Sequence, residues 1–333
     1  MRKALLLSLI WIFGSASAAW ADPVVMKIGT ATIGDKSDSQ FMLMSLFKTA
    51  VERDSKGRIA VQLYPNSQLG SIPRQIEGVQ FGSIQGYVGA PEFLTGVDER
   101  FQMLSAPGVF RSVAQFYKTL EDPQFNRAFL DLGAEKGIKG IGLTYAVPAS
   151  IYSRRPLQKP SDVAGMKIRT LAGPLQSGEV QLLGGAAIPM PLDQVLIALQ
   201  QGAIDGVLAG VTIGSTFKYY TVAKYMLEIN QPYVATIMIV SKTWFDQLPA
   251  DLQKIVSDDG QRVAREAFGP TRQIVGRARR DWIAGGGQLV ELTAAQQNQL
   301  SDQLSKVGPD VFKDKPPLMR LYDLMLATAN RYR

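Results

Sequence analysis

The sequence contains neither cysteine nor histidine among its 333 residues. Without cysteine there is no disulfide scaffold, no thiol nucleophile and no cysteine-bound metal. Without histidine the chain lacks the commonest general base and the commonest metal ligand, which excludes Ser-His-Asp triads, Cys-His pairs and H-E-x-x-H zinc sites. No two carboxylates stand at a convincing catalytic spacing either. We therefore expect no catalytic residues, no metal and no cofactor.

Long apolar runs are also lacking, since no segment after the N-terminus approaches 18 unbroken apolar residues, and we expect no membrane-spanning helix. The N-terminus has a positively charged start, an apolar stretch at 4–14 and an A-x-A arrangement at Ala19 and Ala21. This pattern predicts a cleavable signal peptide over residues 1–21 and an exported chain. A second A-x-A arrangement lies just upstream and offers another cleavage point.

The net charge of +7 is spread along the chain rather than gathered in one patch. The densest basic cluster, at 276–280, is followed at once by Asp281 and Trp282 and indicates a solvated helix face. Because no aromatic residues alternate with basic ones, we expect no nucleic-acid partner. A modest positive field favours small anionic solutes instead.

Hydrophobic periodicity predicts an α/β fold in two series. In the first series, apolar alternation and turn residues predict strands at 24–31, 58–65 and 83–89, separated by helices at 38–57 and 71–82. Strands that alternate with helices in this way are typical of a parallel sheet. Asp38 or Ser39 is placed to cap the first of these helices.

Residues 138–156 contain two strand-like runs around Pro148 with no helix between them, which indicates a crossing from one lobe to another. The second series follows, with strands expected at 166–170, 186–190 and 203–210 and helices at 173–183 and 191–202. A chain of roughly 310 residues after the leader exceeds the size at which one core stops growing. Two lobes with a cleft between them are the expected architecture.

The remaining segments predict a helical stretch over 112–137, punctuated by Pro123, and an apolar strand at 233–241 that returns the chain to the first lobe. A long amphipathic helix is expected over 249–284, interrupted only at Gly260 and at the Gly-Pro pair 269–270. Thr293 and Gln296 form a capping box for a further helix.

Three strings carry a resemblance to a known family: VQLYPNSQLGSIPRQIEGVQFGSIQG (61–86), RPLQKPSDVAGMKIR (155–169) and PMPLDQVLIALQQGAIDG (189–206). In their order and spacing they resemble the solute-binding proteins of TRAP (tripartite ATP-independent periplasmic) transporters, of the dicarboxylate-binding-protein type. The resemblance covers nearly the whole exported chain.

The resemblance implies a periplasmic-binding-protein-like, flytrap fold that closes on a small organic acid in the periplasm and delivers it to TRAP membrane permease subunits. It implies binding rather than catalysis. We expect lobe I to comprise 22–146 and 235–274, and lobe II to comprise 147–234 and 275–333 with the C-terminal helices.

Arg169 ends the string G-x-K-x-R, and in the family the arginine at this position pairs with the solute carboxylate. A guanidinium suits that role because its planar fork matches a carboxylate in two parallel hydrogen bonds. The alternative is a scaffold arginine in an ion pair between lobes. The other residues expected to line the ligand site are Ala149, Leu192, Ala209, Ala31, Ala90 and Phe93.

Two of these positions depart from better-known members of the family. Ala209 stands where many relatives have an asparagine, and Ala149 where sialic-acid-type members have a second arginine. The resemblance therefore implies a compact monocarboxylate rather than a sugar acid, whose hydroxyls would stay unpaired in a closed cleft. Glu92 is expected to face solvent or a cation, and Asp205 to be structural.

Three rival functions remain at this stage. An ABC-type solute receptor shares the same flytrap principle. A receptor that presents its ligand to a sensor kinase would use the same site. An exported carboxylate-processing enzyme is disfavoured by the missing acid-base residues.

Overall fold

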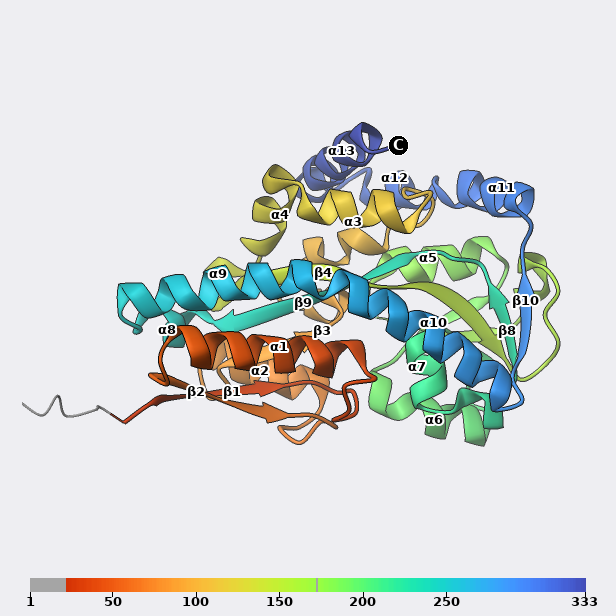
Figure 1. Cartoon of the computed structure of the whole chain (residues 1–333). Helices are drawn as coiled ribbons and strands as arrows, with labels where there is room; N and C mark the ends of the chain where they lie inside the picture. The colour runs from red at the N-terminus through yellow and green to blue at the C-terminus, as the bar shows by residue number, and fades with distance from the viewer. Residues whose placement is uncertain (1–21, 172) are drawn as a thin grey trace, which may run out of the picture.

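The computed structural model describes residues 22–171 and 173–333, so the predicted signal peptide, residues 1–21, lies outside the described residues. Within them one mixed sheet of ten strands has the order β2-β1-β3-β9-β4-β7-β5-β6, with β8 pairing with β4 and β10 with β8 (Figure 1). The strands are β1 (Val24–Gly29), β2 (Ile59–Tyr64), β3 (Gly86–Gly89), β4 (Ile138–Ser153), β5 (Lys167–Thr170), β6 (Ala186–Pro189), β7 (Gly206–Gly210), β8 (Tyr225–Glu228), β9 (Tyr233–Ser241) and β10 (Gln288–Glu291).

The α-helices surround this sheet, together with short 3-10 turns such as η1 (Pro91–Leu94) and η2 (Glu99–Ser105). They are α1 (Ser39–Asp54), α2 (Ile72–Phe81), α3 (Val113–Glu121), α4 (Pro123–Leu130), α5 (Pro174–Leu182), α6 (Leu192–Gln201), α7 (Val211–Thr216), α8 (Lys242–Asp246), α9 (Ala250–Glu266), α10 (Phe268–Ala284), α11 (Ala294–Leu304), α12 (Val307–Phe312) and α13 (Pro316–Arg331). No helix of the described residues is long and apolar enough to cross a membrane.

The first predicted series is confirmed. β1 pairs in parallel with β2 and with β3, and α1 and α2 are the connecting helices. Asp38 is the N-cap of α1 and accepts hydrogen bonds from the backbone N–H groups of Gln40 and Phe41. This local bonding explains why α1 begins where it does, since a carboxylate at the N-cap satisfies amides that have no partner within the helix.

β4 is a single strand of 16 residues, where the sequence predicted two runs around Pro148. It pairs antiparallel with β9 as far as Pro148, opposite Tyr233, and with β7 from Ala149, opposite Gly210. Pro148 lacks a backbone N–H and lies where the strand changes partners, so it interrupts no continuous ladder. β4 and β9 thus connect the two series directly.

The second predicted series is also confirmed. β5 lies between β6 and β7 and is parallel to both, with Arg169 opposite Ile188 on one side and Val207 on the other. The carboxyl ends of these strands therefore meet at one edge of the sheet, the usual place for a ligand in α/β folds. Arg169 is carried to that edge by the central strand of the three.

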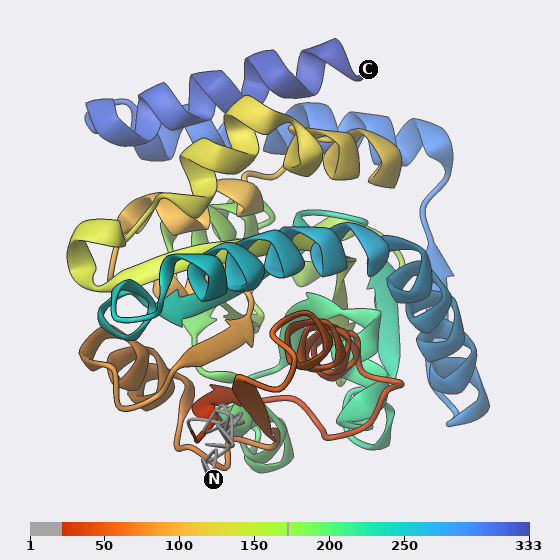
Figure 2. The same ribbon diagram turned by 60° about the vertical axis from the view of Figure 1, so that its left-hand side comes forward.

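The long helix over 249–284 is two helices, α9 and α10, and the predicted interruption at Gly260 is wrong. The break falls at Ala267, and the Gly-Pro pair 269–270 lies in the first turn of α10, where a proline costs no hydrogen bond. A Cβ on Gly260 would lie 2.4 Å from the carbonyl oxygen of Ile141, so this glycine lets α9 approach β4 closely. Figure 2 shows α9 running across the middle of the molecule and α10 continuing down one side of it.

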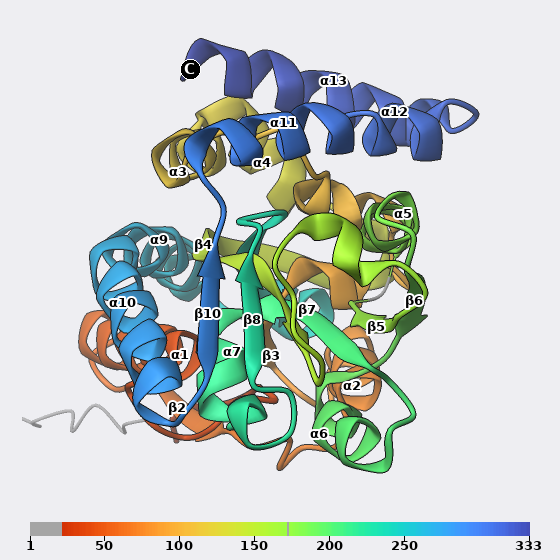
Figure 3. The same ribbon diagram turned by 90° about the vertical axis from the view of Figure 1, so that its right-hand side faces the viewer.

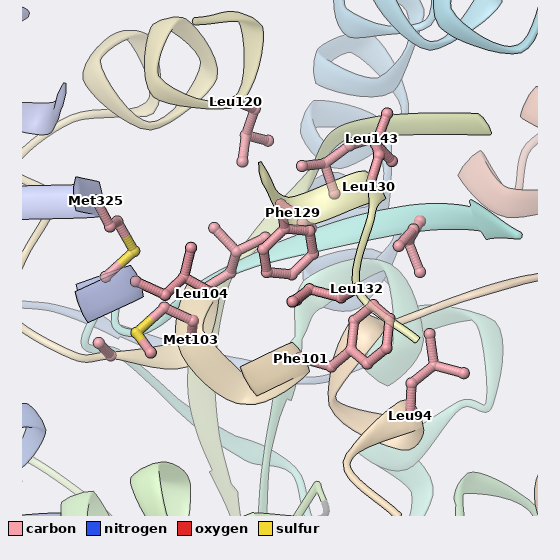
Figure 4. Close-up of a cluster of buried hydrophobic side chains, with 14 of the residues drawn as sticks. Leu94, Phe101, Met103, Leu104, Leu120, Phe129, Leu130, Leu132, Leu143 and Met325 are labelled. Atoms are coloured by element: carbon pink, nitrogen blue, oxygen red, sulfur yellow. The ribbon is translucent and has the colours of Figure 1, made fainter. Parts of the chain in front are cut away.

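The C-terminal helices form a layer over α3 and α4 (Figure 3). Pro123 begins α4 rather than breaking a longer helix, and the capping box of Thr293 and Gln296 is present at α11. Below this layer is the largest buried apolar cluster, in which Phe101 meets the edge of Phe129 with ring centroids 5.8 Å apart and Met325 of α13 packs nearby (Figure 4). Alternate residues of β9 enter this cluster and a second one, so both faces of the sheet are covered.

Candidate functional site

A small cavity of about 60 Å³ lies where the two halves of the sheet meet. It is bounded by the N-terminus of α1, the β3–η1 connection, the middle of β4, the ends of β5 and β7, the first turn of α6 and the start of β9. Such a volume has room for roughly four water molecules. Segments from both halves of the chain contribute to its wall.

Most of the predicted site residues surround this cavity. Its lining includes Arg169, Ala149, Leu192, Ala209, Ala90 and Phe93. Ala31 is not part of the lining; it is half-buried and packs against the largest apolar cluster. Contact of any of these residues with a solute stays a prediction.

Arg169 is the one cation that the described residues contribute to the lining, and it is only 1% exposed. Its Nε and Nη2 donate hydrogen bonds of 3.0 and 2.8 Å to the carbonyl oxygen of Met190. These two atoms form the side-on edge of the guanidinium. The end-on edge, with one Nη1 hydrogen and the second Nη2 hydrogen, makes no hydrogen bond within the described residues and remains free for a carboxylate.

No carboxylate of the described residues balances this cation. Burial lowers the pKa of Arg169 to about 10, which leaves the guanidinium protonated at neutral pH, and the neighbouring Tyr219 acts weakly in the opposite direction. A buried charge without a partner is costly. A solute carboxylate would supply the missing charge and the missing acceptors together.

Small apolar residues form the wall beside the arginine. Ala209 of β7 lies in the ladder opposite Ser150 of β4, next to the pair formed by Ala149 and Gly210. Ala149 is 1% exposed and Ala209 8%. Neither position offers a hydrogen-bonding side chain to a solute, so this part of the cavity suits compact apolar groups.

The structure adds polar lining residues that sequence reasoning missed, chiefly Asp38 and Gln40 from the start of α1, Gln176 and Thr212. The sequence identified Asp38 only as a candidate helix cap, and no local signal shows that a cap also faces a cavity. Burial raises the pKa of the Asp38 carboxyl, while the hydrogen bonds that it accepts from Phe41, Thr32 and Gln40 act in the opposite direction.

Two acidic residues considered in the sequence analysis, Glu92 and Asp205, make hydrogen bonds within the protein and do not line the cavity. Glu92 is fully buried and accepts a hydrogen bond from the Ser105 hydroxyl, so the expectation that it faces solvent or a cation is wrong. Burial raises the pKa of Glu92 to about 7. Asp205 is structural as predicted, because its carboxylate accepts a hydrogen bond of 2.8 Å from the backbone N–H of Lys167 at the start of β5.

The chemistry available in the cavity is limited. Within residues 22–171 and 173–333, Asp38 and Arg169 are the only ionisable residues that line it. Among the residues that the structure describes, no group of three or more acidic side chains could hold a metal ion. The arrangement therefore suits non-covalent capture of an anion.

Comparison with known proteins gives concordant results. Residues 30–315 match the family described as bacterial extracellular solute-binding protein, family 7. The chain is 27% identical over 314 residues to the 2,3-diketo-L-gulonate-binding periplasmic protein YiaO of Escherichia coli K12, covering 92% of this chain and 93% of the relative. It is 27% identical over 304 residues to the C4-dicarboxylate-binding periplasmic protein DctP of Rhodobacter capsulatus, covering 88% of each chain.

A solved structure has the same fold. A TRAP periplasmic solute-binding protein from Desulfovibrio salexigens, with bound orotic acid, matches with a TM-score of 0.86 at 22% identity. The match covers 93% of this chain and 99% of that chain. The expected two-lobed α/β architecture is thereby confirmed at the level of the fold.

Proposed function

The chain belongs to the bacterial extracellular solute-binding proteins of family 7, the solute receptors of TRAP transporters, and on that premise we propose that it captures a compact organic acid with one carboxylate. In this proposal the protein works in the periplasm and delivers the acid to the membrane permease of its transporter. The predicted signal peptide at 1–21 and the periplasmic relatives support that compartment.

The observation that carries the proposal is the free end-on edge of Arg169. The guanidinium is buried, has no counter-charge among the described residues and is held by Met190 on its other edge. A carboxylate bound there forms two charge-assisted hydrogen bonds with the guanidinium. The ABC-type and enzymatic alternatives draw no support from any specific contact.

The size and lining of the cavity support a compact solute. A volume of about 60 Å³ leaves little room for a chain of hydroxyls, and Ala149 and Ala209 offer no hydrogen-bonding side chains to them. One relative is named for binding 2,3-diketo-L-gulonate, a sugar acid. We expect this chain to differ from it, because unpaired hydroxyls in an apolar wall weaken binding.

The division into lobes is part of the same proposal. Lobe I would comprise 22–146 and 235–274, and lobe II 147–234 and 275–333. The change of partners along β4, from Tyr233 of β9 to Gly210 of β7, supports a boundary close to the cavity. Closure of the lobes about β4 and β9 would then enclose the solute.

We also propose that the solute is released chemically unchanged. Asp38 and Arg169 are far too small a set for general acid-base or nucleophilic chemistry. Incubation of the protein with a bound acid, followed by chromatography, should return that acid intact.

Isothermal titration calorimetry with a panel of acids tests the proposal. The panel contains propionate, butyrate, pyruvate, lactate, succinate and glucuronate. We expect a short monocarboxylate to bind at least about tenfold more tightly than glucuronate, a difference of about 1.4 kcal/mol. Tighter binding of glucuronate or another uronic acid than of every monocarboxylate would overturn it.

A further inference from the structure

Asp38 presents the second charged group of the cavity, and its two carboxylate oxygens have different surroundings. Oδ1 accepts three hydrogen bonds, from the N–H of Gln40 at 2.9 Å, the N–H of Phe41 at 3.0 Å and the Thr32 hydroxyl at 2.7 Å. These bonds fix the side chain and cap α1. Oδ2 accepts no hydrogen bond within the described residues, although the side chain is 2% exposed and lines the cavity.

A carboxylate oxygen without a protein donor has hydrogen-bonding capacity that a solute can use. Gln40 repeats the pattern beside it: its Oε1 accepts a hydrogen bond of 2.8 Å from the Thr30 hydroxyl, while its Nε2 makes none within the described residues. Both residues line the cavity, are anchored by one polar atom, and carry a second polar atom that makes no hydrogen bond within the described residues.

Asp38 and Arg169 do not satisfy each other. The hydrogen bonds of each group go to other partners, and no ion pair joins the two within the described residues. The cavity thus holds a cation and an anion that are separate, each with unused hydrogen-bonding capacity. A solute that lies between them can satisfy both only if it carries an acceptor at one end and a donor at the other.

We propose that the solute carries, besides its carboxylate, a hydrogen-bond donor that Asp38 accepts, either a hydroxyl or an ammonium group. This inference rests on the proposed function, in which Arg169 holds the carboxylate. It narrows the solute from any compact monocarboxylic acid to a short hydroxy or amino acid.

The same geometry fixes the orientation of the solute. Backbone N–H groups at the start of a helix ordinarily attract an anion. In α1, however, the N–H groups of Gln40 and Phe41 already donate hydrogen bonds to the Asp38 carboxylate. A second carboxylate near Asp38 would be repelled by like charge. The solute carboxylate therefore goes to Arg169, and the uncharged or cationic end goes to Asp38.

Calorimetry with matched acids tests the inference, using propionate against lactate and alanine, and butyrate against its 3-hydroxy and 4-amino derivatives. We expect the wild-type protein to bind at least one hydroxy or amino acid about tenfold or more tightly than the unsubstituted acid, as for a hydrogen bond to a charged group. Asp38→Ser keeps a helix cap but removes Oδ2, and should bring that ratio to within about threefold.

Asp38→Asn distinguishes a hydroxyl donor on the solute from an ammonium donor. Its amide oxygen keeps the three bonds of Oδ1 and places an NH₂ group where Oδ2 was, so it should reject an ammonium strongly and weaken a hydroxyl contact less. Asp122→Ser is the matched control, because Asp122 caps α4 through the N–H groups of Gln124 and Phe125 and lies outside the cavity lining.

The outcomes separate this inference from the proposed function. If unsubstituted acids bind, and substituted acids bind no better, the inference is overturned while the proposed function stands. A preference for hydroxy or amino acids that survives in Asp38→Ser also overturns it. If no monocarboxylate in the panel binds at all, the proposed function itself fails.

Discussion

The carbonyl oxygen of Met190 accepts two hydrogen bonds from Arg169, one from Nε at 3.0 Å and one from Nη2 at 2.8 Å. The backbone N–H of Met190 in turn donates to the carbonyl of Thr170, the residue after the arginine. The guanidinium is therefore oriented before any solute arrives. A group that is already fixed loses less entropy on binding, which favours affinity.

Replacement of Arg169 should remove affinity without unfolding the protein. Arg169→Met keeps the apolar stem but loses the charge and the fork, and we expect the affinity for a bound acid to fall by about 2–5 kcal/mol, or roughly 30-fold to several thousand-fold. Arg169→Lys should recover part of this loss, because an ammonium keeps the charge but not the planar geometry. Calorimetry and thermal unfolding of the same samples measure both quantities.

Arg154→Ala is the control for this pair, since Arg154 is exposed and lies at the end of β4 outside the cavity lining. It should leave affinity unchanged. A scaffold arginine at 169 gives the opposite result: the unliganded variant would melt at lower temperature, and its affinity per folded molecule would be that of the wild type.

A larger side chain in place of Ala209 should block the cavity. In Ala209→Leu the longer side chain enters a space of about 60 Å³ beside Arg169, so we expect the affinity for every acid to fall at least about tenfold through loss of volume. Ala203→Leu makes the same change at an exposed position just before β7 and should bind normally. Equal affinities in the two variants would show that Ala209 does not border the bound solute.

Glu179 should make the stability of the protein depend on pH. It is fully buried in α5, neither carboxylate oxygen has a hydrogen-bond partner within the described residues, and burial raises its pKa from 4.5 to about 8. Between these values the folded state binds more protons than the unfolded state. The free energy of unfolding therefore falls as pH rises through this window, by at most about 1.4 kcal/mol per pH unit from this group.

Glu179→Gln removes that titration, so its advantage in stability over the wild type should grow from pH 4.5 to pH 8 and then level off. Urea unfolding at pH 5, 6.5 and 8 measures the difference. Glu135→Gln, which removes the same charge from an exposed position, is the control. Parallel stability curves for wild type and Glu179→Gln would contradict the prediction.

Much of the fold could be predicted because its signals are local. The alternation of Ile59 and Val61 identifies β2, and Thr293 with Gln296 identifies the start of α11. Interpretations failed where a distant contact decides the outcome. The low helix propensity of glycine predicts a helix break at Gly260. In the structure, α9 continues through Gly260, and the missing side chain lets the backbone of β4 approach the helix closely.

The buried acids show the same limit. Glu92 follows a strand and precedes an aromatic residue, which gives no sequence signal for complete burial beside Ser105. Residues 92 and 105 lie on two 3-10 turns, and only their packing brings the two side chains into contact. A carboxylate whose nearest partner is 13 residues away along an irregular segment cannot be placed from periodicity.

The sequence by itself determined which chemistry is available. The absence of cysteine and histidine follows from composition alone, and the strand that carries Arg169 to its carboxyl end follows from local hydrophobic spacing. The tertiary structure decided which groups share the cavity. Asp38 and Arg169 are 131 positions apart in the chain, and the parallel and antiparallel pairing of β1, β3, β9, β4, β7 and β5 brings their elements together. Sheet register is a long-range property, so a helix cap becomes a cavity residue only when the chain has folded.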